Sequence, residues 1–72
     1  MGRLRRISGA EVCQILEAHG FVEVRRRGSH ALMQRREPGT TTSVPVPLHD
    51  ELRLGTLSSI IRQSGLARAL FE

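Results

Sequence analysis

The sequence predicts an α+β fold in which a helix, three strands and a second helix follow one another along 72 residues. Apolar residues recur with a helical period in the first and last quarters, whereas β-branched and alternating segments fill the middle. Two hairpin-length turns, Gly28-Ser29 and Pro38-Gly39, separate the middle segments, so the strands should pair as an antiparallel sheet. We expect both helices to cover one face of this sheet and to leave the other face open.

Length and composition restrict the class of protein. The chain has room for one domain, residues 1–72, with one small core. All eleven basic residues are arginine, and against seven acidic residues they give a formal net charge of +4. Arginine binds phosphate in a bidentate manner, so the surplus favours a nucleic acid partner, although a codon bias toward arginine gives the same count. With two phenylalanines and no tryptophan or tyrosine, the chain has almost no aromatic platform for base stacking.

Cysteine usage and hydropathy indicate the compartment. A single cysteine, Cys13, excludes an internal disulfide and a multi-cysteine metal site, which fits a reducing environment. No apolar run is as long as a membrane span, and the N-terminus lacks the apolar stretch of a signal peptide. We therefore expect a soluble, cytoplasmic protein that uses no membrane, no metal and no cofactor.

The first helix is expected from about Gly9 to His19. Ser8 and Glu11 have the spacing of a capping box, in which side chain and backbone bond reciprocally at the helix start. Gly20 stands where a left-handed residue commonly ends a helix, and His19 would then lie in the last turn, at the negative end of the helix dipole.

Three strands are expected at Phe21–Arg26, His30–Arg36 and Thr41–Val46. Pro45 and Pro47 have no N–H to donate to a neighbouring strand, so the end of the third strand should be an edge or lie outside the sheet.

The second helix is expected to begin at Gly55-Thr56-Leu57, with Thr56 as the N-cap, and to end at Gly65. The preceding segment, Leu48–Leu54, has no clear preference. The segment Leu66–Phe71 is expected to close the fold as a short turn or helix.

The candidate site is the turn between the first two strands. Histidine has an unperturbed pKa near neutrality, so His30 can give or take a proton at cellular pH. The neighbouring arginines and the turn suggest a phosphate-rich ligand such as a nucleic acid. The candidate binding residues are Arg25, Arg26, Arg27, Gly28, Ser29 and Arg36. Strand alternation places Arg36, but not Arg35, on the face of His30. Taken singly, an arginine run is also typical of a solvated edge, and a histidine at a turn is also typical of a structural residue.

Several short motifs occur in a fixed order along the chain: Gly20-Phe21, Gly28-Ser29-His30, Val44-Pro45-Val46-Pro47 followed by His49, Gly55-Thr56-Leu57, and Ile60-Ile61-Arg62-Gln63-Ser64-Gly65-Leu66. None is specific alone. The ordered set covers nearly the whole chain and resembles the HicA-type toxin family of bacterial toxin–antitoxin systems.

This resemblance implies a fold similar to the double-stranded RNA-binding domain. It also implies cleavage of mRNA without a required metal, which shuts down translation, and it places the family's catalytic histidine on His30. The implied partners are mRNA and a HicB-type antitoxin that covers the active site. The sequence departs from the usual family pattern by one extra residue before His49. His49 itself is either a second proton-transfer group or a structural residue.

A second interpretation is a non-catalytic RNA-binding module with the same fold. Domains that bind duplex RNA usually carry a basic cluster at the start of their last helix. Here that helix has no positive charge until Arg62. This absence weighs against ordinary duplex binding and favours the Arg25–His30 region as the contact site.

Overall fold

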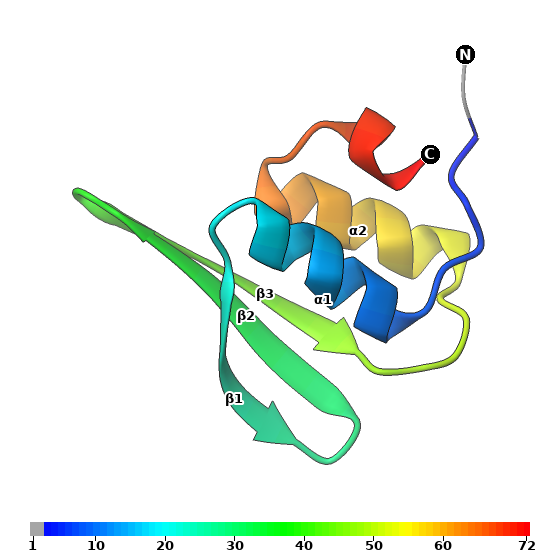
Figure 1. The fold of residues 1–72 in the computed structure, drawn as a ribbon, viewed down its shortest axis with the longest axis horizontal. Coiled ribbons are helices and arrows are strands. Elements are labelled where there is room, and N and C mark those ends of the chain that lie inside the picture. The colour runs from blue at the N-terminus through cyan, green and yellow to red at the C-terminus, as the bar shows by residue number, and fades with distance from the viewer. Residues whose placement is uncertain (1–2) are drawn as a thin grey trace.

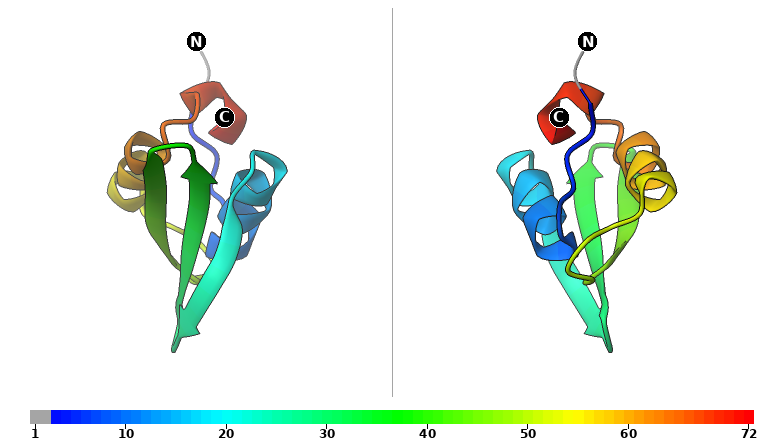
Figure 2. Two further views of the ribbon diagram at one scale, coloured as in Figure 1. Left: turned by 90° about the vertical axis from the view of Figure 1, so that its left-hand side faces the viewer. Right: turned by 90° about the vertical axis from the view of Figure 1, so that its right-hand side faces the viewer.

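The structure is a computed structural model, and it describes residues 3–72 (Figure 1). Its elements are α1 (Gly9–Ala18), β1 (Val22–Arg27), β2 (His30–Glu37), β3 (Thr40–Pro47), α2 (Leu54–Ser64) and a short 3-10 helix, η1 (Arg68–Phe71). The strands pair in the order β1-β2-β3, and both pairs are antiparallel. Both helices lie on one side of the sheet, as the two side views show (Figure 2). The predicted α-β-β-β-α fold is therefore confirmed.

Helix α1 begins with the predicted capping box. The Ser8 hydroxyl accepts from the Glu11 N–H at 3.1 Å, and the Ser8 N–H donates to the Glu11 carboxylate at 3.1 Å. The helix ends at Ala18, so the prediction that His19 lies in the last turn was wrong by one residue. His19 is the C-cap, with a φ of −118°, because the chain already turns out of the helix toward Gly20, whose φ is +94°.

The core fills the space between the sheet and the helices. On β2 and β3 every second residue points toward the helices, and Ala31, Met33, Val44 and Val46 are completely buried. The other buried apolar residues are Ile7, Val12, Cys13, Leu16, Phe21, Leu52, Leu57, Ile60 and Phe71. The period-2 pattern of the strands and the helical periodicity thus converge on one core.

Strand β1 contributes less to this core than its apolar residues suggest. Its register with β2 shifts between Glu23 and Arg25, which marks a β-bulge at Val24. Val22 and Val24 are 61% and 48% exposed, and Phe21, just before the strand, is the residue that is buried. The valines therefore lie on the solvent side of the sheet.

Helix α2 begins at Leu54, and its N-cap lies three residues before the predicted N-cap, Thr56. Its N-cap is Arg53, whose carbonyl accepts from the Leu57 N–H at 2.9 Å, and Thr56 lies inside the first turn. The physical reason is the anchoring of the preceding residue. Leu52 is buried, and its N–H donates to the Ile7 carbonyl at 2.9 Å, so the chain is already fixed where the helix starts. Gly65 ends the helix with a φ of +72°, as predicted.

Candidate functional site

His30 is the first residue of β2 and is exposed on the open face of the sheet. Its register partners are Arg27 on β1 and Pro47 on β3. Residues that lie directly opposite each other on antiparallel strands project from the same face. The imidazole therefore shares the open face with the Arg27 guanidinium on one side and the Pro47 ring on the other. Gly28 enables the tight turn before it, with a φ of +57°.

A groove of about 400 Å³ lies beside His30, between β3 and α2. His30, Pro45 and Pro47 line it from the sheet. The α2 side carries two hydroxyls and an amide among its lining residues, which are Gly55, Thr56, Ser59, Ile60 and Gln63. Sequence reasoning placed no functional residue on this helix. A helical spacing of polar residues at 56, 59 and 63 was the available signal, but it is also typical of a solvated helix face.

Backbone contacts fix the turn that carries His30. The Ser29 carbonyl accepts from the Leu48 N–H at 2.6 Å, which ties the turn to the chain after β3. That segment is held in turn by α1, because the Gly9 N–H donates to the His49 carbonyl at 2.9 Å. A side chain at Gly9 would overlap the Pro47 carbonyl oxygen, so only glycine permits this approach. Ser29 thus supports the site through its main chain.

The three consecutive arginines do not share one face. By register, Arg25 and Arg27 project from the open face, whereas Arg26 lies opposite Ala31 and projects toward the helix side. Arg26 forms a two-pronged ion pair with Glu23, with N–O distances of 2.8 and 3.1 Å. This hydrogen bonding lowers the pKa of the Glu23 carboxylate and raises the pKa of Arg26. Of the three arginines, Arg26 is the one already engaged by a carboxylate.

Arg35 and Arg36 project from opposite faces of β2. The Arg35 guanidinium lies 4.8 Å from the centre of the Phe21 ring and donates to the His19 carbonyl at 3.3 Å. Arg36 is exposed on the open face, beside the two exposed valines of β1. It is six residues from His30, which is about 20 Å along a strand. Arg36 therefore shares a face with His30 but cannot contact the same phosphate.

Other titratable groups lie apart from this groove. His49 is exposed, and within residues 3–72 no hydrogen bond of its imidazole is found; its carbonyl carries its one contact, with Gly9. Cys13 is buried, and burial, followed by the nearby Glu23 carboxylate, raises the pKa of its thiol. No group of three His, Cys, Asp or Glu side chains in the described part of the chain is arranged to hold a metal ion.

The fold and the groove define a small basic α+β protein with an imidazole exposed on the open face of an antiparallel sheet. Comparison with known families gives the particular assignment. Residues 9–66 match the family described as the HicA toxin of bacterial toxin–antitoxin systems. This match covers more than half of the chain, which therefore belongs to the HicA toxin family. A search of curated proteins found no match. Across residues 3–72, no helix is long and apolar enough to span a membrane.

Proposed function

We propose that this toxin is an endoribonuclease that cleaves mRNA in the cytoplasm and thereby stops translation, with His30 as general acid or base. The observation that carries the proposal is the position of His30. It is exposed at the start of β2, and it lines a groove whose other wall offers the hydroxyls of Thr56 and Ser59 and the amide of Gln63. An imidazole at the surface of a groove is accessible to a strand of RNA.

The proposed chemistry uses the 2′-hydroxyl of the RNA itself. That oxygen attacks the adjacent phosphorus, the bond from phosphorus to the 5′-oxygen breaks, and the products are a 2′,3′-cyclic phosphate and a 5′-hydroxyl. His30 either accepts the proton of the 2′-hydroxyl or donates one to the departing 5′-oxygen. Arg27, opposite His30 on β1, supplies positive charge where the phosphate gains negative charge. Gly28 has no side chain to obstruct the RNA backbone.

The RNA-binding surface in this proposal is the open face of the sheet. Arg25, Arg27 and Arg36 project from it. Arg25 and Arg27 contact phosphates near His30, and Arg36 contacts a more distant one, because phosphate contacts dominate the affinity of basic proteins for RNA. Ser29 contributes its main chain, and Arg26 contributes only if it leaves Glu23. We further propose a HicB-type antitoxin as the partner that covers His30.

The test is incubation of the protein with a defined mRNA in EDTA, followed by analysis of the product ends. We expect cleavage by the wild type and a loss of about 10²-fold or more in the His30→Ala variant, the range for removal of a general acid or base. His49→Ala is the matched control, because both imidazoles are exposed and lie outside the core. It should retain most activity if His30 alone transfers protons.

Two other outcomes of this experiment would contradict the proposed mechanism. Undiminished cleavage by His30→Ala would remove His30 from the mechanism. RNA binding without cleavage by any variant, including the wild type, would favour the non-catalytic RNA-binding module. That alternative rests on the same exposed arginines of the open face and needs no proton transfer.

A further inference from the structure

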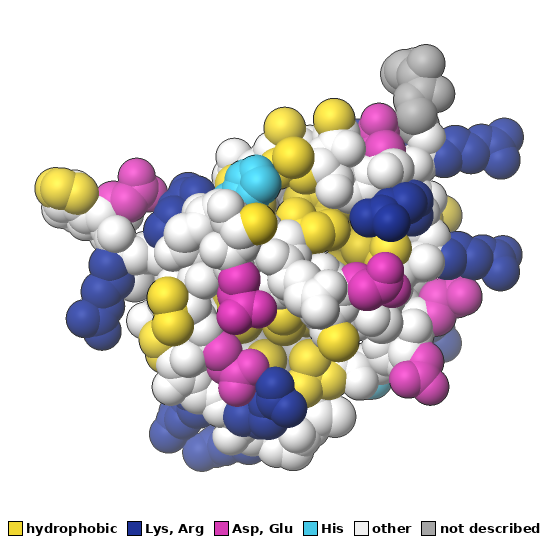
Figure 3. Space-filling model, viewed as in Figure 1, with side chains coloured by type: hydrophobic (Ala, Val, Ile, Leu, Met, Phe, Trp, Pro, Cys, Tyr) yellow, Lys and Arg dark blue, Asp and Glu magenta, His cyan; other side chains and the backbone are white. Residues whose placement is uncertain are grey.

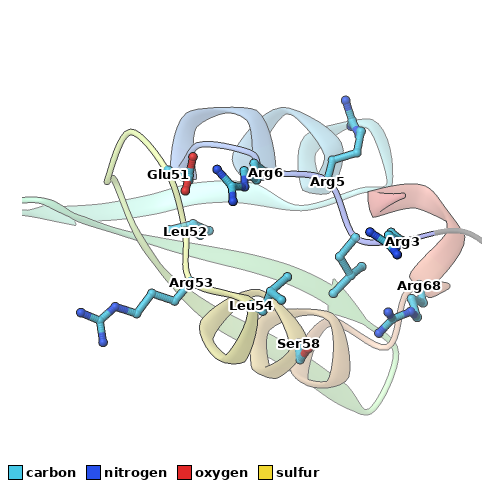
Figure 4. Close-up of a pocket in the computed structure, with 10 residues that line it drawn as sticks. Arg3, Arg5, Arg6, Glu51, Leu52, Arg53, Leu54, Ser58 and Arg68 are labelled. Carbon is cyan, nitrogen blue, oxygen red and sulfur yellow. The ribbon is translucent and has the colours of Figure 1, made fainter.

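A second hollow, of about 610 Å³, lies on the helix side of the molecule, away from the open face of the sheet. The N-terminal arm, the start of α2 and η1 surround it (Figure 4). Its lining is unusually rich in arginine, with one carboxylate, and consists of Arg3, Leu4, Arg5, Arg6, Glu51, Leu52, Arg53, Leu54, Ser58 and Arg68. We call this the arm hollow. Nothing in the proposed cleavage reaction uses it.

Charge is concentrated at the rim of the arm hollow. Figure 4 shows Arg3 and Arg68 at one end, Arg6 and Glu51 at the other, and Arg53 directed outward. Arg68 forms an ion pair with Glu72 at 3.3 Å. The other lining arginines form no ion pair with any residue in 3–72. On the face that Figure 3 shows, arginine side chains project at several places along the outline of the molecule, including the side where the N-terminal end lies. Apart from Arg68, the arginines that line the arm hollow therefore have no ion-pair partner within residues 3–72.

The middle of the arm hollow is apolar. Leu52 is buried beneath it, and Leu4 packs partly against the core. Leu54, in the first turn of α2, is 62% exposed, the largest exposed fraction among the large apolar residues of the described chain. Burying an apolar side chain is favourable, so a partner that covers Leu54 gains free energy from this contact.

Helix α2 lies between the arm hollow and the His30 groove and lines each with a different side. Leu54 and Ser58, four residues apart, face the arm hollow, whereas Gly55 and Ser59 face the groove. Adjacent positions on a helix differ by about 100°, so the two surfaces are distinct flanks of one helix. A variant on one flank can therefore be read independently of the other.

We propose that the arm hollow is a docking site for an acidic segment of the antitoxin, carrying at least one apolar side chain, separate from any contact over His30. Carboxylates of the segment pair with Arg3, Arg6 and Arg53, and the apolar side chain covers Leu54. The inference rests on membership of the toxin–antitoxin family, which implies a protein partner, and does not depend on the ribonuclease activity.

Protein fits this hollow better than RNA does. Phosphates would pair with the arginines equally well, but they would leave Leu54 exposed, and no aromatic side chain lines the hollow to stack a base. An acidic, partly apolar peptide matches both the rim and the centre. Charged rims mainly accelerate association and select the partner, while the buried apolar contact slows dissociation.

The test measures binding of the antitoxin encoded beside the toxin to two folded variants. Arg3→Glu with Arg53→Glu reverses two exposed rim charges, and Leu54→Ser removes the apolar contact. We expect the double variant to bind about tenfold or more weakly at low salt, and Leu54→Ser to lose a smaller factor. Arg62→Glu is the control for charge reversal on α2 outside the hollow. It makes half of the charge change of the double variant and should retain the affinity. Circular dichroism verifies the fold of each variant.

Cleavage of a defined mRNA, measured in parallel, separates this proposal from the previous one. Weaker antitoxin binding with unchanged cleavage supports docking in the arm hollow. Unchanged antitoxin affinity overturns it, and so does reduced cleavage by a folded variant, which would assign the hollow to RNA. If the wild type does not cleave RNA at all, the proposed function fails, while the antitoxin measurement still decides the docking site.

Discussion

The two faces of the sheet have opposite characters although they alternate along the same strands. On β2, Ala31 and Met33 face the helices and are completely buried, whereas His30, Gln34 and Arg36 face outward. The covered face contains the apolar residues that hold the fold together. The open face contains the groups that can meet a ligand. Adjacent residues of a strand lie on opposite faces, so substitutions at neighbouring positions can change stability and proposed activity independently.

The largest expected difference between the faces is in stability. Met33→Ala should lower the free energy of unfolding by about 2–5 kcal/mol, because it leaves a cavity in a fully buried site. Gln34→Ala is the control from the open face. It loses one exposed hydrogen bond, to the Ser43 hydroxyl at 3.0 Å, and should lower stability by less than about 1 kcal/mol. Urea denaturation measures both, and equal losses would contradict the contrast.

The next prediction tests how α1 fixes the end of the sheet beside His30. Gly9→Ala should lower stability by about 1–3 kcal/mol, because the new methyl group overlaps the Pro47 carbonyl and forces the backbone to move. Gly55→Ala is the matched control within α2. No atom other than those of its chain neighbours and its own helix backbone lies within 4 Å of the added methyl group, so it should raise stability by about 0.5–1 kcal/mol. Thermal denaturation of both variants checks the sign. A stabilising Gly9→Ala would refute the close approach.

The neighbouring arginines of β2 provide the sharpest comparison of the faces. Arg35→Ala should lower stability by about 1 kcal/mol, because its guanidinium covers the Phe21 ring. Arg36→Ala should leave stability within about 0.5 kcal/mol but weaken RNA binding and reduce the salt slope by about one. Denaturation and RNA titrations at several salt concentrations measure the two effects. If Arg35→Ala weakened RNA binding more than Arg36→Ala did, the RNA would lie on the helix side of the sheet and the proposed binding face would be refuted.

The smallest expected effect is the pH dependence due to Cys13. Burial raises the pKa of its thiol, so the folded state disfavours the thiolate. The stability contribution is therefore complete below the pKa of the unfolded thiol, about 8.5, and is lost as pH rises through the higher folded pKa. Folded protein should react more slowly with a thiolate-selective reagent than denatured protein does. Cys13→Ala should flatten this alkaline decline in stability, and an unchanged decline would assign it to other groups.

Sequence patterns predicted the features that depend on local chemistry. The capping box at Ser8, the glycine turns and the phase of Arg36 each follow from a few adjacent residues. The predicted start of α2 was wrong because the helix start depends on a tertiary contact, the burial of Leu52 in the core. The α2 wall of the His30 groove was not predictable for a similar reason. It exists because α2 packs beside β3, and the periodicity of a helix does not state which strand it will accompany.

The arm hollow was also beyond prediction. It depends on backbone hydrogen bonds, such as the one from Leu52 to Ile7, which leave no trace in residue type. The arginines of the arm were visible in the sequence as charge alone. Their position around the same hollow as Leu54 required the folded chain.

The backbone bond from the Arg5 N–H to the Phe71 carbonyl, 3.1 Å long, joins segments from the two ends of the described chain. It makes the fold nearly circular in its connectivity. A short peptide linker could therefore connect the N-terminal arm and η1 in a variant built from residues 3–72, and new termini could be opened at Pro38-Gly39, an exposed hairpin tip. In such a circular permutant, the contact between Arg5 and Phe71 would be local in sequence, whereas in the present chain it joins the most distant segments. The same native packing would then be reached by a different order of events.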